Sequence, residues 1–168
     1  MPRRSLVLFV AGGTLVLAGA IGARLLGRPA QVGEIRLPAL LGELPLAEAR
    51  TGAAAEAEIQ RLHGRALPLT SAAFARYGPA GEAMLWVGGT ASEAEAAALL
   101  EAMLRAIETA DSPFTPLEPL VIAGVTVFPL SGMGQEHMYF QSGRLVLWLS
   151  ADSRVAEVAR LAVVEAYR

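Results

Sequence analysis

The sequence lacks cysteine, and it also contains no lysine and no asparagine. Without cysteine, disulfides, iron–sulfur ligation, thiolate zinc sites, thiol catalysis and attachment of a lipid to a cysteine are all excluded. All 14 basic residues are therefore arginines, set against 16 acidic residues. Residues 1–30 hold four arginines and no acid, so the remainder has 14 − 4 = 10 arginines and 16 acids, a net charge of −6. A nucleic-acid-binding protein needs a basic face, so we expect no nucleic-acid partner.

Charged residues are also scarce in proportion to apolar ones. They make up 18% of the chain, against 54% apolar residues, and the mean hydropathy is +0.44. Such a composition argues against disorder and indicates a segment embedded in a membrane. At 168 residues, the chain has room for one compact domain and an appendage.

A long uncharged run lies near the N-terminus. The 19 residues 5–23 carry no charged side chain and are bordered by arginine on both sides. A helix of this length spans about 28 Å, close to the thickness of the hydrocarbon core of a bilayer. We therefore predict a single transmembrane helix in contact with membrane lipid. The alternative is a cleaved signal peptide, because Ala18-Gly19-Ala20 places small residues where such a peptide is cut.

The predicted organisation has three parts: an N-terminal membrane anchor or uncleaved signal at 1–27, a tether at 28–36 and a globular domain at 37–168. The tether opens a proline-containing stretch without a sustained period. Arginines 3 and 4 favour a cytoplasmic N-terminus. We therefore expect a single-pass protein of the cell membrane with its C-terminal domain on the extracytoplasmic side.

Helical and extended patterns alternate within the domain. Helices are expected over 51–64, over 91–109 and after Asp152 or Ser153, and strands over 66–77, 82–88, 120–130, 137–141 and 144–149. The expected N-caps include Thr51 and a capping box from Thr90 to Glu93. The last helix is expected to turn Val155, Val158, Leu161 and Val164 inward. These patterns predict an α+β fold, an antiparallel sheet of about five strands with two or three helices on one face.

Strand alternation sorts the side chains of the last two predicted strands into two faces. A turn at Ser142-Gly143 would pair His137 with Trp148. Met138, Phe140, Leu145, Leu147 and Leu149 would then face the helices. The opposite face would carry a candidate partner-binding or ligand-binding surface of Trp86, His137, Tyr139, Gln141, Arg144 and Trp148. The competing interpretation is that the tether, an extra strand or a second subunit covers this face as ordinary core.

Metal binding is a second, weaker hypothesis. Met133, His137 and Met138 lie within six residues, and thioether and imidazole ligands suit copper(I). Alternation places His137 and Met138 on opposite faces, and methionine also fills irregular cores, so core packing is favoured. The other histidine, His63, lies in the last turn of a predicted helix, where an imidazole commonly bonds free carbonyls.

No catalytic motif is present in the sequence. Neither histidine lies in a nucleophile-elbow setting, and no glycine-rich phosphate loop occurs. We therefore expect no enzymatic activity and no cofactor. The predicted function is a binding or accessory domain that supports a membrane-associated complex through a protein partner or self-association. The alternatives are an accessory copper chaperone that uses His137 with nearby methionines, and a small enzyme without a recognisable motif.

Overall fold

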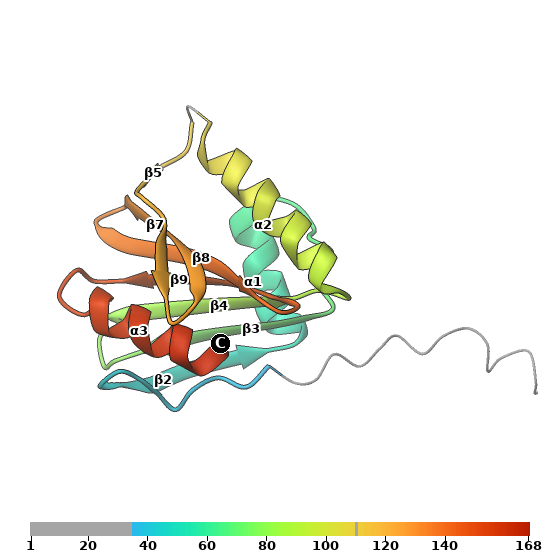
Figure 1. The fold of residues 1–168 in the computed structure, drawn as a ribbon. Helices are drawn as coiled ribbons and strands as arrows, with labels where there is room; N and C mark the ends of the chain where they lie inside the picture. The colour runs from blue at the N-terminus through green and yellow to red at the C-terminus, as the bar shows by residue number, and fades with distance from the viewer. Residues whose placement is uncertain (1–34, 110) are drawn as a thin grey trace, which may run out of the picture. The chain divides into compact units, whose positions relative to one another are not determined.

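The computed structural model describes residues 35–109 and 111–168 (Figure 1). These residues form strands β1 (Leu40–Leu41), β2 (Leu44–Thr51), β3 (Ser71–Tyr77), β4 (Ala83–Gly89), β5 (Phe114–Pro116), β6 (Leu120–Ile122), β7 (Val125–Gly132), β8 (Gln135–Ser142) and β9 (Leu145–Ala151). The helices are α1 (Ala53–His63), α2 (Glu93–Ile107) and α3 (Ala156–Tyr167). The predicted membrane helix at 5–23 and the possible cleavage site lie outside the described residues.

Among the residues that are described, no helix has the length and apolar character needed to cross a bilayer.

All strand pairs are antiparallel, which confirms the predicted α+β class with an antiparallel sheet. The order is β1-β2-β3-β4-β9-β8-β7-β5, and β6 pairs with β7 beside β5. The described residues thus form nine strands, so the prediction of about five was too low. One cause is the stretch 120–130, where Ala123 and Gly124 adopt φ of 49° and 83° and turn the chain back as a hairpin.

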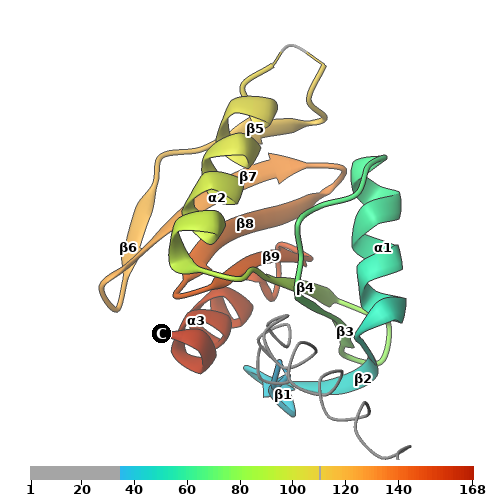
Figure 2. The same ribbon diagram turned by 90° about the vertical axis from the view of Figure 1, so that its right-hand side faces the viewer.

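Helices cover both faces of the sheet, so the prediction of helices on one face was wrong. Helix α1 contacts β2 and β3, and α2 contacts β5, β8 and β9, while α3 lies across β1, β8 and β9 on the other side (Figure 2). The reason is visible in β8, where the four consecutive residues 137–140 are buried. Since successive side chains point to opposite faces, such a strand needs cover on both sides.

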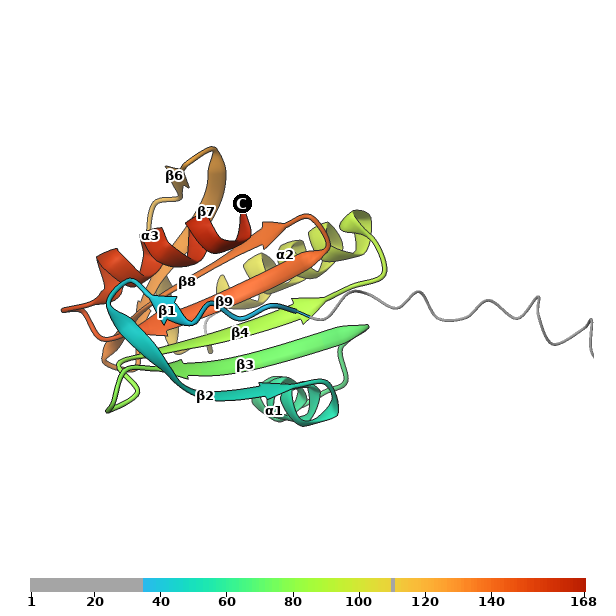
Figure 3. The same cartoon turned by 90° about the horizontal axis from the view of Figure 1, so that it is seen from below.

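The larger core lies between the sheet and α3. It includes Tyr77, Leu85, Phe140, Leu147 and Val163, and it takes in Ile35 and Leu41 from the segment before β2. Figure 3 shows this segment and β1 crossing in front of the strands. Two tyrosines hold it there: the Tyr77 hydroxyl donates to the Pro38 carbonyl at 3.1 Å, and the Tyr167 hydroxyl donates to the Arg36 carbonyl at 3.0 Å. The first described residues are thereby fixed beside the C-terminal end of α3.

The helix ends differ in detail from the sequence prediction. Thr51 belongs to β2, and α1 starts after Gly52, which makes no side-chain cap. In α2 the capping box is displaced by two residues: the Ser92 hydroxyl accepts from the Glu95 amide at 3.2 Å, and the Glu95 carboxylate accepts from the Ala91 amide at 3.1 Å. Neither Asp152 nor Ser153 caps α3 with its side chain, because that helix starts only at Ala156, after Val155.

Candidate functional site

Four of the residues predicted to share a surface do share one face of the sheet: Trp86, His137, Tyr139 and Trp148. Trp86 lies directly opposite Trp148, and Trp148 lies directly opposite Tyr139. The register of the last hairpin is shifted by two residues from the prediction, so His137 pairs with Ser150. The shift arises because Gly143, with φ 53°, takes the first turn position, with Arg144 as the second. A shift of two residues leaves each side chain on its predicted face.

That face is covered by α1 and α2 rather than free. Helix α2 packs on Tyr139 and Trp148 through its apolar residues Leu100, Met103, Leu104 and Ile107. Helix α1 packs in the cluster that contains Trp86. His137 is 6% exposed and Tyr139 is 2% exposed, while both tryptophans are half-buried. The cover thus comes from two helices, which the prediction had placed on the opposite face, and not from the tether, an extra strand or a second subunit.

Two phenylalanines that the sequence analysis did not single out complete an aromatic cluster. The ring centroid of Phe114 lies 4.9 Å from that of His137 and 5.1 Å from that of Trp148. Phe128 stacks on Tyr139 with the ring centroids 5.4 Å apart. Phe128 lies directly opposite Tyr139, a pairing that follows once β7 is placed beside β8. Phe114 comes from residues 112–119, a stretch with three prolines between α2 and β6, where the sequence has no periodicity that would identify it.

His137 sits in this cluster with both ring nitrogens engaged. The Trp148 indole, which can only donate, points to Nδ1 at 3.3 Å. Nε2 lies 3.1 Å from the Gly132 carbonyl, which can only accept, so the hydrogen of the neutral ring is on Nε2. Desolvation lowers the pKa of His137, opposed by the bond to Gly132. Burial, with a smaller contribution from Glu108, raises the pKa of Tyr139 to about 12.

The remaining predicted site residues are dispersed. Gln141 donates to the carbonyls of Glu93 at 3.1 Å and Gly143 at 2.9 Å, and exposed Arg144 lies in the turn. Met138 is buried on the α3 face, away from His137. Met133 is 76% exposed in the turn between β7 and β8.

The three side chains of the copper hypothesis, Met133, His137 and Met138, therefore do not lie together in the structure. Within the described part of the chain, no group of three or more His, Asp or Glu side chains could hold a metal ion. His63 bonds through Nδ1 to the Ile59 carbonyl of its own helix at 2.8 Å, in keeping with the structural role expected for it.

A different surface is exposed along α3. The helix buries Ala156, Ala159, Val163 and Val164, whereas Val158 is 52% and Leu161 is 51% exposed. The prediction that these two face inward was wrong, because α3 carries two apolar stripes and the alanine-containing stripe packs on the sheet. The buried stripe combines Ala156 and Ala159 with Val163 and Val164, and the other stripe stays exposed.

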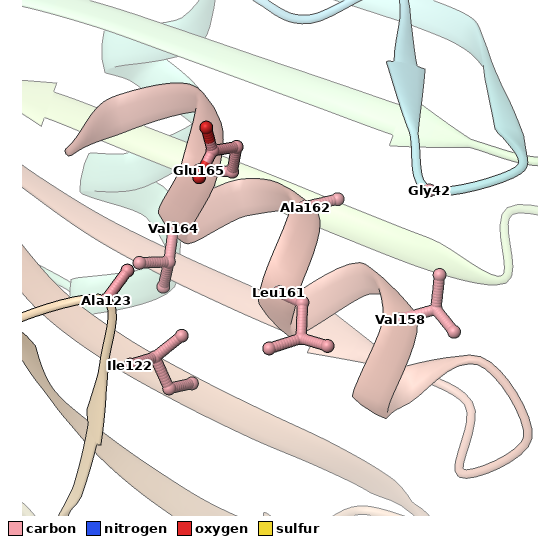
Figure 4. A pocket seen from close by; sticks show the side chains of 8 residues that line it. All are labelled: Gly42, Ile122, Ala123, Val158, Leu161, Ala162, Val164 and Glu165. Atoms are coloured by element: carbon pink, nitrogen blue, oxygen red, sulfur yellow. The ribbon is translucent and has the colours of Figure 1, made fainter.

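The exposed stripe forms part of an open depression of about 420 Å³ (Figure 4). Gly42, in the turn between β1 and β2, borders it on one side of α3, and Ile122 and Ala123 border it on the other. Glu165 supplies the one ionisable side chain among the described lining residues. A nucleophile with a neighbouring base, or a set of metal ligands, is not present along this lining, so the depression is suited to binding apolar groups.

Comparison with known proteins adds no family to this description: no family model, curated protein or solved structure matches the chain.

Proposed function

We propose that the protein is a single-pass, membrane-anchored accessory protein whose extracytoplasmic domain binds an apolar segment of a membrane-associated partner protein along α3. The observation that carries this proposal is the outward apolar stripe of α3. Val158, Leu161, Ala162 and Glu165 follow the spacing i, i+3, i+4, i+7, so one side of the helix is apolar for two turns and then ends in a carboxylate.

The depression supports binding of a protein segment better than binding of lipid or nucleic acid. Its walls come from three separate places in the chain: the turn between β1 and β2, the turn between β6 and β7, and α3. A domain with a net charge of −6 outside residues 1–30, from 10 arginines and 16 acids, is repelled by anionic lipid and by phosphate backbones. An apolar helix or strand of a partner would bury these side chains without a charge conflict.

Site-specific photocrosslinking in native membranes tests this proposal. A photoreactive amino acid at Leu161 should yield a discrete adduct of higher mass, whereas the same group at Leu62 of α1 should not. Leu62 is the matched control because it is 53% exposed, close to the 51% of Leu161. Equal labelling from both positions would contradict the proposal.

A pair of substitutions provides the second arm. Leu161→Gln should abolish the adduct formed from a photoreactive group at neighbouring Ala162, and Leu62→Gln should leave it unchanged. Both variants should keep the melting temperature of the parent, since each changes a half-exposed side chain. An adduct that survives Leu161→Gln would place the partner elsewhere.

A further inference from the structure

Within the part of the chain that the structure describes, the edge of the sheet at β2 is unpaired along part of its length. Strand β1 pairs only with the start of β2, through Leu41↔Leu44 and Leu40↔Pro45. Beyond Leu46, whose amide donates to Ala39 at 3.0 Å, no strand among the described residues pairs with the outer side of β2. Residues 47–51 accordingly lie at the margin of the sheet (Figure 3).

The backbone groups at this edge can be assigned. Gly52 donates to the Ala72 carbonyl at 2.9 Å, and Arg50 pairs with Phe74 in the same register, so these residues direct their backbone toward β3. Hydrogen-bonding direction alternates along an antiparallel strand. The N–H and C=O groups of Ala49 and Thr51 therefore point outward, where an added strand would bond to them.

The side chains of this edge are self-complementary. Glu48 and Arg50 flank Ala49 and lie on the same face, where they form an ion pair at 2.6 Å. Glu48 also pairs with Arg76 at 3.4 Å, and Arg50 with Glu58 at 3.8 Å. An antiparallel copy of the strand centred on Ala49 would set Glu48 opposite the second copy's Arg50, and Arg50 opposite its Glu48.

We propose that the outer edge of β2 is a self-association site, where two copies of the chain join their sheets antiparallel about Ala49. Two backbone hydrogen bonds between the Ala49 residues and two cross-strand ion pairs define the register. Charge selects this register over its neighbours, because an alignment centred on Arg50 would place the two Arg50 side chains opposite each other. The site is independent of the α3 surface used for the proposed partner.

A charge-swap mixing experiment tests the site with the full chain in mild detergent, its mass measured by native mass spectrometry or light scattering. The parent should form dimers. In Glu48→Arg and in Arg50→Glu the facing charges become alike, so each variant alone should dimerise about tenfold more weakly or worse. Mixed in equal amounts, the two variants should form a one-to-one heterodimer, since every facing pair is again opposite in charge. A monomeric parent, or variants that fail to associate on mixing, would overturn the proposal.

Ala49→Pro decides the question if a charge variant does not fold. Proline lacks the N–H that would bond across the two-fold axis, and it is tolerated at an edge where that N–H does not serve the sheet. This variant should keep the parent's circular dichroism and lose dimerisation, whereas the control Leu161→Gln should keep both. A folded Ala49→Pro chain that dimerises like the parent would refute the proposed edge.

Discussion

His137 links the aromatic cluster to the solution pH. In the neutral ring, Nδ1 accepts a hydrogen bond from the Trp148 indole. A second proton on the ring would occupy Nδ1, break this hydrogen bond and place two N–H groups against each other. The folded state therefore resists protonation, consistent with the lowered pKa of this group. The unfolded chain binds the proton near the ordinary histidine pKa of about 6.5.

We predict that this difference destabilises the protein as the pH falls. Below about pH 6.5 the His137 imidazole is protonated in the unfolded state but stays neutral in the folded state. The free energy of unfolding therefore decreases as the pH falls, until the pH reaches the lowered pKa of the folded state. Urea unfolding of the parent and of His137→Gln should be compared at pH 7.5 and pH 5.5. The loss of stability should be larger in the parent, and equal losses would contradict this role of His137.

At the scale of the elements, the contact between the β1–β2 turn and α3 depends on one small residue, Gly42. It lies in the turn between β1 and β2 with φ 63°, and a Cβ added there would lie 2.4 Å from Cγ1 of Val158 on α3. The turn can therefore rest on α3 only because the side chain is absent.

We predict that Gly42→Ala destabilises the domain by about 2–3 kcal/mol, through the left-handed backbone and the clash together. Gly134→Ala is the matched control, because Gly134 has φ 77° and an added Cβ would meet no atom within 4 Å. It should cost only the backbone contribution, roughly 1–2 kcal/mol. Adding Val158→Ala to Gly42→Ala should recover part of the loss. Equal effects of the two glycine variants in urea unfolding would show that the contact with α3 is unimportant.

The three helices and strands β3, β4, β8 and β9 were readable from the sequence, whereas β1, β2 and β5, and the helices that cover each face, were not. Alternation assigned Tyr139 and Trp148 to one face and Met138 and Leu147 to the other, and the structure confirms both assignments. The face that each helix covers is set by contacts between residues far apart in the chain. Local periodicity gives no information about such contacts. The two apolar stripes of α3 illustrate the limit: periodicity favoured the stripe with Val158 and Leu161, whereas the stripe with Ala159 is the one that is buried.

At the scale of the whole molecule, the N-terminal segment predicts how the protein is attached to the membrane. The 19 uncharged residues 5–23 predict an integral membrane protein with an intact N-terminus. Washing native membranes at high pH should therefore leave the full-length chain in the pellet, because a spanning helix resists conditions that remove peripheral proteins. Recovery of a soluble form that begins near Ile21 would show that the segment is a cleaved signal peptide instead.

The pairing of β4 with β9 has a consequence for how the domain forms. Strands β1–β4 and strands β5–β9 are each built from neighbours in the chain, and β4–β9 is the one junction between these two sets in the described sheet. Closing it brings together residues as distant as Ala83 and Ala151, a non-local step that is slow compared with forming a hairpin. The only two tryptophans of the chain, Trp86 and Trp148, face each other at the middle of this junction. The intrinsic fluorescence of these two tryptophans should therefore report, during folding, on the step in which β4 pairs with β9.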